Sequence, residues 1–461
     1  MSINPTRMLA ISAASLILCG ACGAQTRDAA GPSLPPNASD DLTLLLAQPQ
    51  RCGDEKSPSE LRSLRLAAVL HTVICNHPGV RRGMGLTAQA QASLDLAKSQ
   101  NWPSTSVSAG ADANRGSPTG WGAALNLQWV LFDFGRRSAG TVQAGQALAA
   151  VLDEQRTEVL NAVGSAALLY AAAQAASGRL EAATINLRTA DDSARVSDAR
   201  HGAGASTLND MLQAKTALAQ ARLEQSRATS QWLSARGALA VAMRLPASTT
   251  LEFAPSESAD GPAAELPIAI DALVDEARSS HPRITAARAR VAQAQARADS
   301  VRAERWGRIA LSASSGRSRP AYGADVETTS SAQITWAVPL FDGGSLNARK
   351  DEAQGQIQTD QVALDDALSQ VELQVWQQAQ ALISERAARR DSQTVLESAE
   401  TSLRVAAERF RLGVGNFSDV LTAQNSAANA RFQAVESKAN LRREQLRLAA
   451  AVGRFGSLLR L

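Results

Sequence analysis

The side chains that most often carry out catalysis are scarce in this sequence, and they are not grouped. Its four histidines are His71, His77, His201 and His281, and their spacing does not form a metal-ligand set. His77 and His281 each precede a proline at a predicted helix start, where a structural role is expected. The sequence contains no GxSxG motif, no HExxH motif and no phosphate-binding loop. We therefore predict a protein that is not an enzyme and that holds no cofactor or metal.

The N-terminus has the pattern of an export signal. Arg7 precedes an apolar run over residues 8–18, and small residues follow from Cys19 to Ala24. The run is too short to span a membrane, so we predict a cleaved signal peptide over residues 1–24. Cys22 is a candidate for lipidation, although Cys19 stands where a lipoprotein signal usually has leucine.

Two further cysteines, Cys52 and Cys75, remain after that cleavage. An isolated pair in an exported protein is more often a disulfide than a metal site. A Cys52–Cys75 bond would fasten the extended N-terminal segment, residues 25–63, to the first helix. Two free thiols are the alternative.

The predicted secondary-structure elements occur twice along the chain, as two copies of one repeat. The offset between the copies is 204 residues at the start (77 to 281) and 211 near the end (201 to 412). We predict a first repeat over residues 64–250, a linker over 251–267, a second repeat over 268–455 and a tail over 456–461. The matching landmarks are His77-Pro78 with His281-Pro282, Trp102 with Trp306, Trp129 to Asp133 with Trp336 to Asp342, and His201-Gly-Ala-Gly204 with Leu412-Gly-Val-Gly415.

The positions of proline indicate two very long helices. All sixteen prolines lie at or before Pro339, and none occurs from residue 119 to 245. Because proline breaks helix interiors, we predict helices over about residues 136–200 and 345–410, each roughly 95 Å long. Shorter helices return over about 207–245 and 417–452, after glycines that permit left-handed turns. These glycines are Gly202, Gly204, Gly413 and Gly415. A tube of closely packed helices suits the small residues, and a soluble coiled coil is the alternative.

Apolar and polar residues alternate between Trp102 and Phe134, as in strands with one apolar and one polar face. The second copy repeats the pattern, and we predict hairpins over about residues 104–132 and 308–341. Strands of about ten residues can cross a bilayer in a tilted barrel, and five of the seven tryptophans lie in or beside the hairpins. Four strands cannot close a barrel, and lipid does not tolerate open edges. The chain must therefore associate, and three copies would supply twelve strands.

The charge balance gives no reason to expect a nucleic-acid partner. Basic and acidic residues number 47 and 44, which leaves a net charge of +3, and no basic block stands out. Taken together, the patterns predict an α+β membrane protein made of a duplicated helix–strand–strand–helix–helix unit.

From about residue 60 to 455 the sequence resembles the TolC family of outer-membrane efflux proteins. The resemblance is carried by the paired His-Pro helix starts, by the strand-to-helix junctions, and by the segment Gly415-x3-Asp419-Val-Leu. It implies a homotrimer with a twelve-stranded β-barrel in the outer-membrane lipid and a long α-helical barrel in the periplasm. It also implies a periplasmic adaptor protein and an inner-membrane pump, either an ABC transporter or a proton-driven pump. The junction residues are Phe132, Asp133, Gly135, Phe341, Asp342, Gly343 and Gly344.

The same resemblance indicates a gate at the periplasmic end. Asp419 matches the position of the family's acidic ring, Thr422 stands where a second acid is often found, and Phe410 stands at an aromatic gate position. Thr207 and Asp210, in the first reversal, are lesser candidates. The structural alternative for Asp419 is a helix cap or a solvated surface residue.

The segment from Arg65 to Pro78, RLAAVLHTVICNHP, resembles the branch of the family that serves type I protein secretion. We therefore predict the exit duct of a tripartite export system, with a protein toxin as the favoured cargo. Multidrug or small-molecule efflux uses the same scaffold and is the first alternative. A secreted coiled-coil scaffold without a channel is the alternative of another class.

Overall fold

The computed structural model describes residues 64, 66–112, 120–253, 269–319 and 325–453. The predicted signal peptide, the segment 25–63 and the tail lie outside these residues. So do Cys22, Cys52 and most of the predicted linker.

Both halves of the chain have the same order of elements, which are two helices, two strands, a long helix and a shorter helix. The first half consists of α2 (Leu66–Asn76), α3 (Pro78–Ser99), β1 (Ser104–Asp112), β2 (Gly120–Phe132), α4 (Arg136–Gly202) and α5 (Leu208–Ala242). The second half consists of α6 (Ile270–Ser280), α7 (Pro282–Glu304), β3 (Arg308–Arg319), β4 (Glu327–Ala337), α8 (Ser345–Arg411) and α9 (Phe417–Val452).

Each half begins with two helices and not with the single helix that the sequence pattern predicted. The break falls at His77 and at His281, whose ψ angles are 127° and 126°. A following proline disfavours the helical conformation of the residue before it, so both histidines are extended and a new helix starts at the proline.

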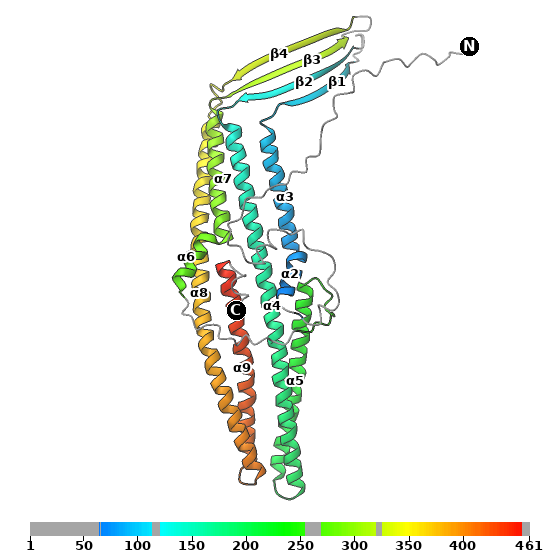
Figure 1. Ribbon diagram of the computed structural model, residues 1–461, viewed down its shortest axis with the longest axis vertical. Helices are drawn as coiled ribbons and strands as arrows, with labels where there is room; N and C mark the ends of the chain where they lie inside the picture. Colours follow the sequence, from blue (N-terminus) through cyan, green and yellow to red (C-terminus); the bar gives the residue numbers. More distant parts are fainter. Residues whose placement is uncertain (1–63, 65, 113–119, 254–268, 320–324, 454–461) are drawn as a thin grey trace, which may run out of the picture.

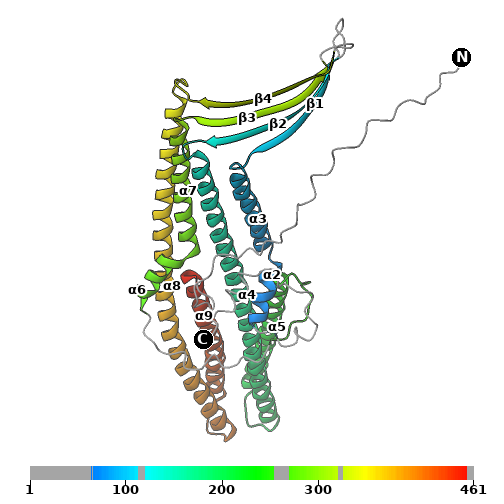
Figure 2. The same ribbon diagram turned by 45° about the horizontal axis from the view of Figure 1, so that its top comes forward.

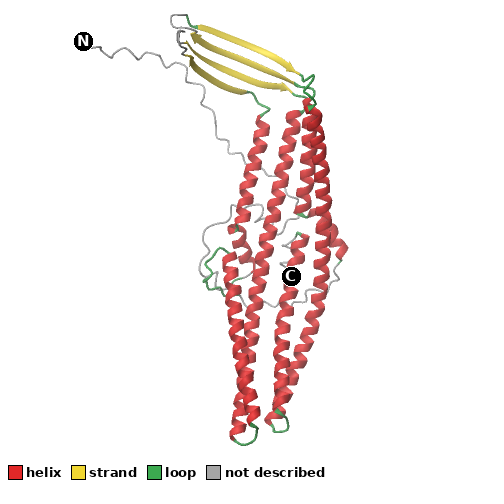
Figure 3. Ribbon diagram, turned by 180° about the vertical axis from the view of Figure 1, so that it is seen from behind, coloured by secondary structure: helices red, strands yellow, loops and turns green. Residues whose placement is uncertain are grey.

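The long helices α4 and α8 have 67 residues each and run from the sheet to the opposite end of the molecule (Figure 1). At 1.5 Å per residue, each is about 100 Å long. Shorter helices cover them in series. Along α4, α3 covers the half near the sheet and α5 covers the far half, while α7 and α9 do the same along α8 (Figure 3). The molecule is thus a column of helices with a sheet at one end and two helix reversals at the other.

The four strands form one antiparallel sheet in the order β1-β2-β3-β4. The sheet is curved and extends to one side from the ends of the helices (Figure 2). The facing register of β2 and β3 joins the two halves of the chain, from Trp121 opposite Arg319 to Phe132 opposite Ile309. β1 and β4 are the edges, and neither has a second partner strand among the described residues.

The sheet has one apolar and one polar face, because directly opposed residues of an antiparallel pair point to the same side. The polar face carries hydroxyl and amide groups, with Arg308 at the helix end and Glu327 at the far end. The apolar face comprises Val107, Ala109, Ala111, Trp121, Ala123, Leu125, Leu127, Trp129, Ile309, Leu311, Ala313, Ala332, Ile334 and Trp336. The polar residues of the other face are Ser104, Ser106, Ser108, Asn126, Gln128, Arg308, Ser312, Ser314, Ser318, Glu327, Thr329, Ser331, Gln333 and Thr335.

β4 is shorter than the hairpin predicted to about residue 341. It ends at Ala337, and Val338 to Phe341 are not strand. Pro339 has no amide hydrogen to donate to a neighbouring strand, which accounts for the early end.

Two apolar clusters lie at mid-height, where the short helices meet. Around α2 and α4, Val69, Val73 and Val163 pack with Leu239 and Met243 from the end of α5. On the α8 side, a matching cluster contains Ile284, Val371, Val375 and Val452. Away from these clusters the buried residues of α4 are mainly alanine, which permits close approach of neighbouring helices but gives little apolar bulk. The two mid-height clusters therefore supply most of the bulky apolar packing between the helices.

Candidate functional site

In the first half, the strand-to-helix junction is held by a buried carboxylate. The Oδ2 atom of Asp133 accepts hydrogen bonds from the backbone N and the Nε of Arg137, both at 2.9 Å. Arg137 also donates from Nη1 to the carbonyl of Gln100 at 3.1 Å. Between them, Phe134 and Gly135 have φ angles of 55° and 93°. The junction thus ties the start of α4 to the segment that enters β1.

In the second half, Asp342 caps the junction. Its Oδ2 accepts from the Ser345 hydroxyl and from the amide of Leu346, each at 2.7 Å, and Oδ1 accepts from the amide of Gly344 at 3.1 Å. The hydrogen bond from Ser345, with those from the two amides, holds the pKa of Asp342 below its ordinary value. Gly343 and Gly344 have φ angles of 68° and 87°, a region in which other residues are strained.

Glu304 joins three helices beneath the sheet. Its carboxylate, at the end of α7, lies 3.1 Å from Nη2 of Arg136 at the start of α4 and 2.7 Å from Nη1 of Arg349 in α8. Its side chain is 15% exposed, so water screens these pairs less than at an open surface. Sequence reasoning missed this residue, since Arg136 and Arg349 lie far from it along the chain.

Aromatic residues gather at the end of the sheet that meets the helices. The indole of Trp129 donates to the carbonyl of Asn101 at 3.1 Å, and that of Trp336 donates to the carbonyl of Trp306 at 3.4 Å. A hydrogen bond from a strand tryptophan to a backbone carbonyl at the helix end therefore occurs in both halves. Trp102, Trp306, Trp336 and Phe341 are exposed. Trp121 is at the far end of the sheet, eight residues from Trp129 along β2.

At the other end of the molecule, the first reversal is closed by a capping box. Thr207 Oγ1 accepts from the amide of Asp210, and the Asp210 carboxylate accepts from the amide of Thr207, both at 3.2 Å. Gly204 is left-handed with φ 71°, whereas Gly202 is the last residue of α4. Both polar side chains are thus engaged in starting α5.

The second reversal leaves its acid free. Gly413 is left-handed with φ 77°, and Asn416 precedes α9 without a side-chain cap. A Cβ on Gly415 would lie 3.1 Å from the Phe410 amide nitrogen, so this position requires close backbone approach. Asp419 is exposed and makes no hydrogen bond or ion pair to a described residue. Thr422 is also exposed, and its hydroxyl donates to the carbonyl of Ser418 at 2.9 Å.

A contact between the two long helices lies just above these reversals. The guanidinium of Arg200 in α4 lies 4.5 Å from the ring centroid of Phe410 in α8, and its Nη1 donates to the Phe410 carbonyl. The Phe410 ring is buried and lies 5.5 Å from that of Phe417. Ala194, Ala214 and Val420 complete this cluster. Arg200 and Phe410 thus join the α4–α5 pair to the α8–α9 pair.

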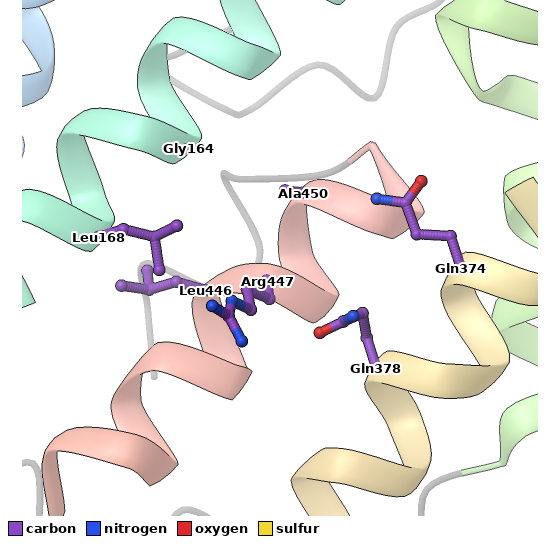
Figure 4. A pocket seen from close by; sticks show the side chains of 7 residues that line it. All are labelled: Gly164, Leu168, Gln374, Gln378, Leu446, Arg447 and Ala450. Atoms are coloured by element: carbon purple, nitrogen blue, oxygen red, sulfur yellow. The ribbon is translucent and has the colours of Figure 1, made fainter.

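A crevice at mid-height lies between α4, α8 and α9. It measures about 210 Å³ and is lined by Gly164, Leu168, Gln374, Gln378, Leu446, Arg447 and Ala450. Figure 4 shows Gln378 of α8 pointing toward Arg447 of α9 and Gln374 pointing toward Ala450, and Arg447 is paired with Glu444 at 2.8 Å. Within the described ranges, no three histidine, cysteine or acidic side chains are placed to hold a metal ion.

His281 has a structural position. Its Nδ1 accepts from the amide of Arg283 at 3.2 Å, which caps α7. Burial, and then the charge of Arg283, lower the pKa of this histidine, which favours the neutral form of the ring that accepts this bond.

Comparison with known proteins identifies the family. The family described as outer membrane efflux protein matches residues 69–243 and 273–454. Protein CyaE of Bordetella pertussis is 32% identical over 417 residues, which cover 86% of this chain and 85% of that protein. The chain belongs to the outer membrane efflux protein family.

Two other similarities agree with the family assignment. The pyoverdine export outer membrane protein OpmQ of Pseudomonas putida is 23% identical over 350 residues, covering 74% of this chain and 71% of OpmQ. The crystal structure of the outer membrane protein VceC from Vibrio cholerae has the same fold, with a TM-score of 0.72 at 21% identity, covering 84% of this chain and 96% of VceC.

As a member of this family the protein is an outer-membrane transport protein with its helical domain in the periplasm. The family and fold are those of channels that work in export systems with an adaptor and an inner-membrane transporter. The predicted family, the predicted export function and the predicted outer-membrane location are confirmed.

Some of the predicted gate residues contact each other, and others lie apart. Phe410 is buried in the contact between helix pairs, while Asp419 and Thr422 lie exposed on the first turns of α9. Thr207 and Asp210 bond to each other. Their gate roles stay predictions. Arg200, which sequence reasoning missed, is marked only by lying one residue before the landmark His201.

The bond between Cys52 and Cys75 also stays a prediction. Cys75 lies in α2 and is disulfide-bonded, and Cys52 lies outside the described residues.

Gly204→Ala should destabilise the first reversal by roughly 1–2 kcal/mol, because alanine at a left-handed φ brings its Cβ against the following carbonyl oxygen. Gly202→Ala is the matched control. It is the last residue of α4, has open space around its Cβ position and has no left-handed φ, so the substitution should be neutral or stabilise by at most about 0.5 kcal/mol. Thermal unfolding followed by helical circular dichroism in detergent measures both. Equal midpoints for the two variants would contradict this assignment.

Proposed function

We propose that three copies of this chain close a twelve-stranded barrel and a continuous helical tunnel, which form the exit duct of a tripartite export system. The observation that carries the proposal is a four-stranded sheet with opposite apolar and polar faces and two unpaired edges among the described residues. In lipid, an edge strand must find a partner. β4 of one copy therefore pairs with β1 of the next, and the ring closes with the apolar face toward lipid.

The interior of this barrel would then be wide and nearly uncharged. Its wall consists mainly of the hydroxyl and amide side chains of the polar face, such as Ser108, Asn126, Ser314 and Gln333. The acid Glu327 and the base Arg308 lie at opposite ends of this face and balance each other in charge. Such a wall binds neither cations nor anions strongly, and it suits passage of chemically mixed cargo. Selection of the cargo then falls to the pump.

The sequence similarity to CyaE favours type I protein secretion, and a resemblance over residues 65–78 points to the same branch. Similarity to the pyoverdine exporter OpmQ is lower, at 23% identity against 32%. Small-molecule efflux is therefore the second candidate function.

Complementation separates the two cargo classes. The chain is expressed in cells that lack their own duct and that carry either an ABC transporter with its adaptor and a glycine- and aspartate-rich repeat protein, or a proton-driven drug pump with its adaptor. We expect the repeat protein in the culture medium. Restored drug resistance with no secreted protein would replace type I secretion by drug efflux.

At the periplasmic end, we propose that the Arg200–Phe410 contact holds the entrance closed. It joins the two helix pairs near their tips, and a pair that moves away from its neighbour must break it. Arg431 of α9 makes a second contact between the two helix pairs, nearer to the sheet. Its side chain donates hydrogen bonds to Asn186 of α4 at 2.8 Å and to Glu400 of α8 at 3.0 Å. Opening then requires untwisting of one pair against the other.

Arg200→Ala should raise the single-channel conductance of purified trimers in planar bilayers, because the contact between pairs loses its hydrogen bond and ring stacking, each worth about 1 kcal/mol. The control is Arg195→Ala, since Arg195 lies on the same helix and pairs with Asp191, also in α4, at 2.5 Å. An Arg200→Ala channel with the conductance of the Arg195→Ala channel would remove Arg200 from the gate.

Asp419→Ala should weaken block of the current by divalent cations added on the periplasmic side. Three unpaired carboxylates, one from each copy, would attract cations to the narrow entrance. Asp210→Ala is the comparison, since that carboxylate is engaged in the capping box. The proposed acidic ring is wrong if block is unchanged in Asp419→Ala.

A further inference from the structure

The apolar face of the sheet has two cationic exceptions, both near the far end of β3. Arg317 stands opposite Ala123 and Thr328, and Arg319 stands opposite Trp121. Because Ala123 and Trp121 belong to the apolar face, both arginines point to that face too. On the proposed barrel, on which this inference rests, they face lipid.

Neither arginine has an anionic partner among the described residues. Neither forms an ion pair there, and the Nε of Arg319 is buried without a hydrogen-bond acceptor. The acid nearest to them in the register of β3 and β4, Glu327, is opposite Ser318 and so points to the polar face. An arginine without an acceptor beside lipid is unfavourable, so the pair calls for an anion supplied from outside the described chain.

The depth of the pair indicates which anion that is. Trp121, opposite Arg319, lies about 26 Å along β2 from Trp129, at about 3.3 Å per residue. A strand tilt of about 40° makes this a rise of about 20 Å across the membrane, and the apolar band between the two aromatic girdles is about 25 Å tall. Trp129 belongs to the girdle at the helix end of the sheet. Trp121 and the two arginines therefore lie at the opposite, outer membrane surface, where lipid headgroups are found.

The surroundings leave room for a headgroup. Arg317 is exposed, and its neighbours across the strands on the same face are the small residues Ala123 and Ala109. Guanidinium groups bind phosphate through paired N–H donors. We propose that Arg317 and Arg319 bind a phosphate of an outer-leaflet lipid headgroup, with Trp121 beside it at the membrane surface, once in each copy of the trimer.

The test uses purified full-length trimers in detergent and lipid A as the probe, with bound lipid counted by native mass spectrometry. Replacing both arginines, Arg317→Gln with Arg319→Gln, should weaken binding about 30-fold, which corresponds to about 1 kcal/mol per arginine near an anionic lipid surface. Arg317→Lys with Arg319→Lys should restore part of it. Arg308→Gln, at the other end of β3, should leave binding unchanged.

Further arms define the ligand. Dephosphorylated lipid A should bind wild type no better than lipid A binds the Gln double variant, and inorganic phosphate at the same concentration should not displace bound lipid A. Equal binding of lipid A to wild type and the Gln double variant would overturn the site. Displacement by free phosphate would overturn the commitment to a lipid. Absence of trimers before any lipid is added would overturn the barrel and the lipid site together. Normal trimers without the expected difference in lipid binding would overturn the lipid site alone.

Discussion

Ile334→Arg should abolish the assembled protein in the outer membrane. Ile334 is 67% exposed in the single chain and stands opposite Leu311 on the apolar face of the sheet. An arginine on the lipid face of a barrel costs about 2–4 kcal/mol at mid-depth and about 0–1 kcal/mol at the membrane surfaces. Ile334 lies two residues inward from Trp336 of the girdle, so we expect an intermediate cost of about 1–2 kcal/mol, which a trimer carries three times. The expected result is loss of trimers that resist detergent at low temperature and dissociate on heating, as seen by electrophoresis.

Gln333→Arg is the matched control, one residue away on the same strand. Gln333 is opposite Ser312, on the polar face, so an arginine there would lie in the water-filled interior. We expect normal trimers whose current shifts toward anion selectivity, because three positive charges would line a nearly neutral wall. If both arginines are tolerated equally, or if the Gln333 variant alone is lost, the assignment of the two faces is wrong.

The second large effect is expected at the periplasmic tips. Leu412 and Val414, at the second reversal, are 76% and 67% exposed, and Leu208 and Leu212 at the first are also exposed. Large apolar side chains exposed together at a helix end mark an interaction surface, and this end lies farthest from the sheet (Figure 1). We propose that the adaptor binds there.

Leu412→Asp with Val414→Asp should therefore stop export, by at least about tenfold in secreted cargo, since two buried interface contacts of this kind are worth about 1.4 kcal/mol or more. Leu412→Ile with Val414→Ile keeps the apolar surface and should retain export. Planar-bilayer recording shows whether the Asp variant still forms a channel. Normal export by the Asp variant would exclude the tips as the adaptor site.

The long elements were predictable because their signals are local. The absence of proline from 119 to 245 fixes a tract that must hold long helices, and α4 begins and ends within two residues of the prediction at Arg136 and Gly202. Alternation of apolar and polar residues located the strands for the same reason. The break at His77 and the end of β4 before Pro339 also have local causes, and attention to each proline would have found them.

The site was less predictable because its contacts join distant parts of the chain. Phe410 has an aromatic side chain that fits a gate, but nothing near it in sequence indicates that Arg200 lies over its ring. Thr207 and Asp210 have the spacing of a capping box, and that local pattern explains both side chains. Glu304 gains its importance only when α4 and α8 both start beside the end of α7.

Three copies of this chain are proposed to form a duct in the outer membrane. The most direct measurement separates outer membrane from soluble periplasm in cells expressing the full chain, then compares heated and unheated detergent extracts by electrophoresis. We expect the protein in the outer-membrane fraction, where it should migrate as a trimer without heating and as a monomer after heating. A soluble periplasmic pool of unassociated chains would contradict it.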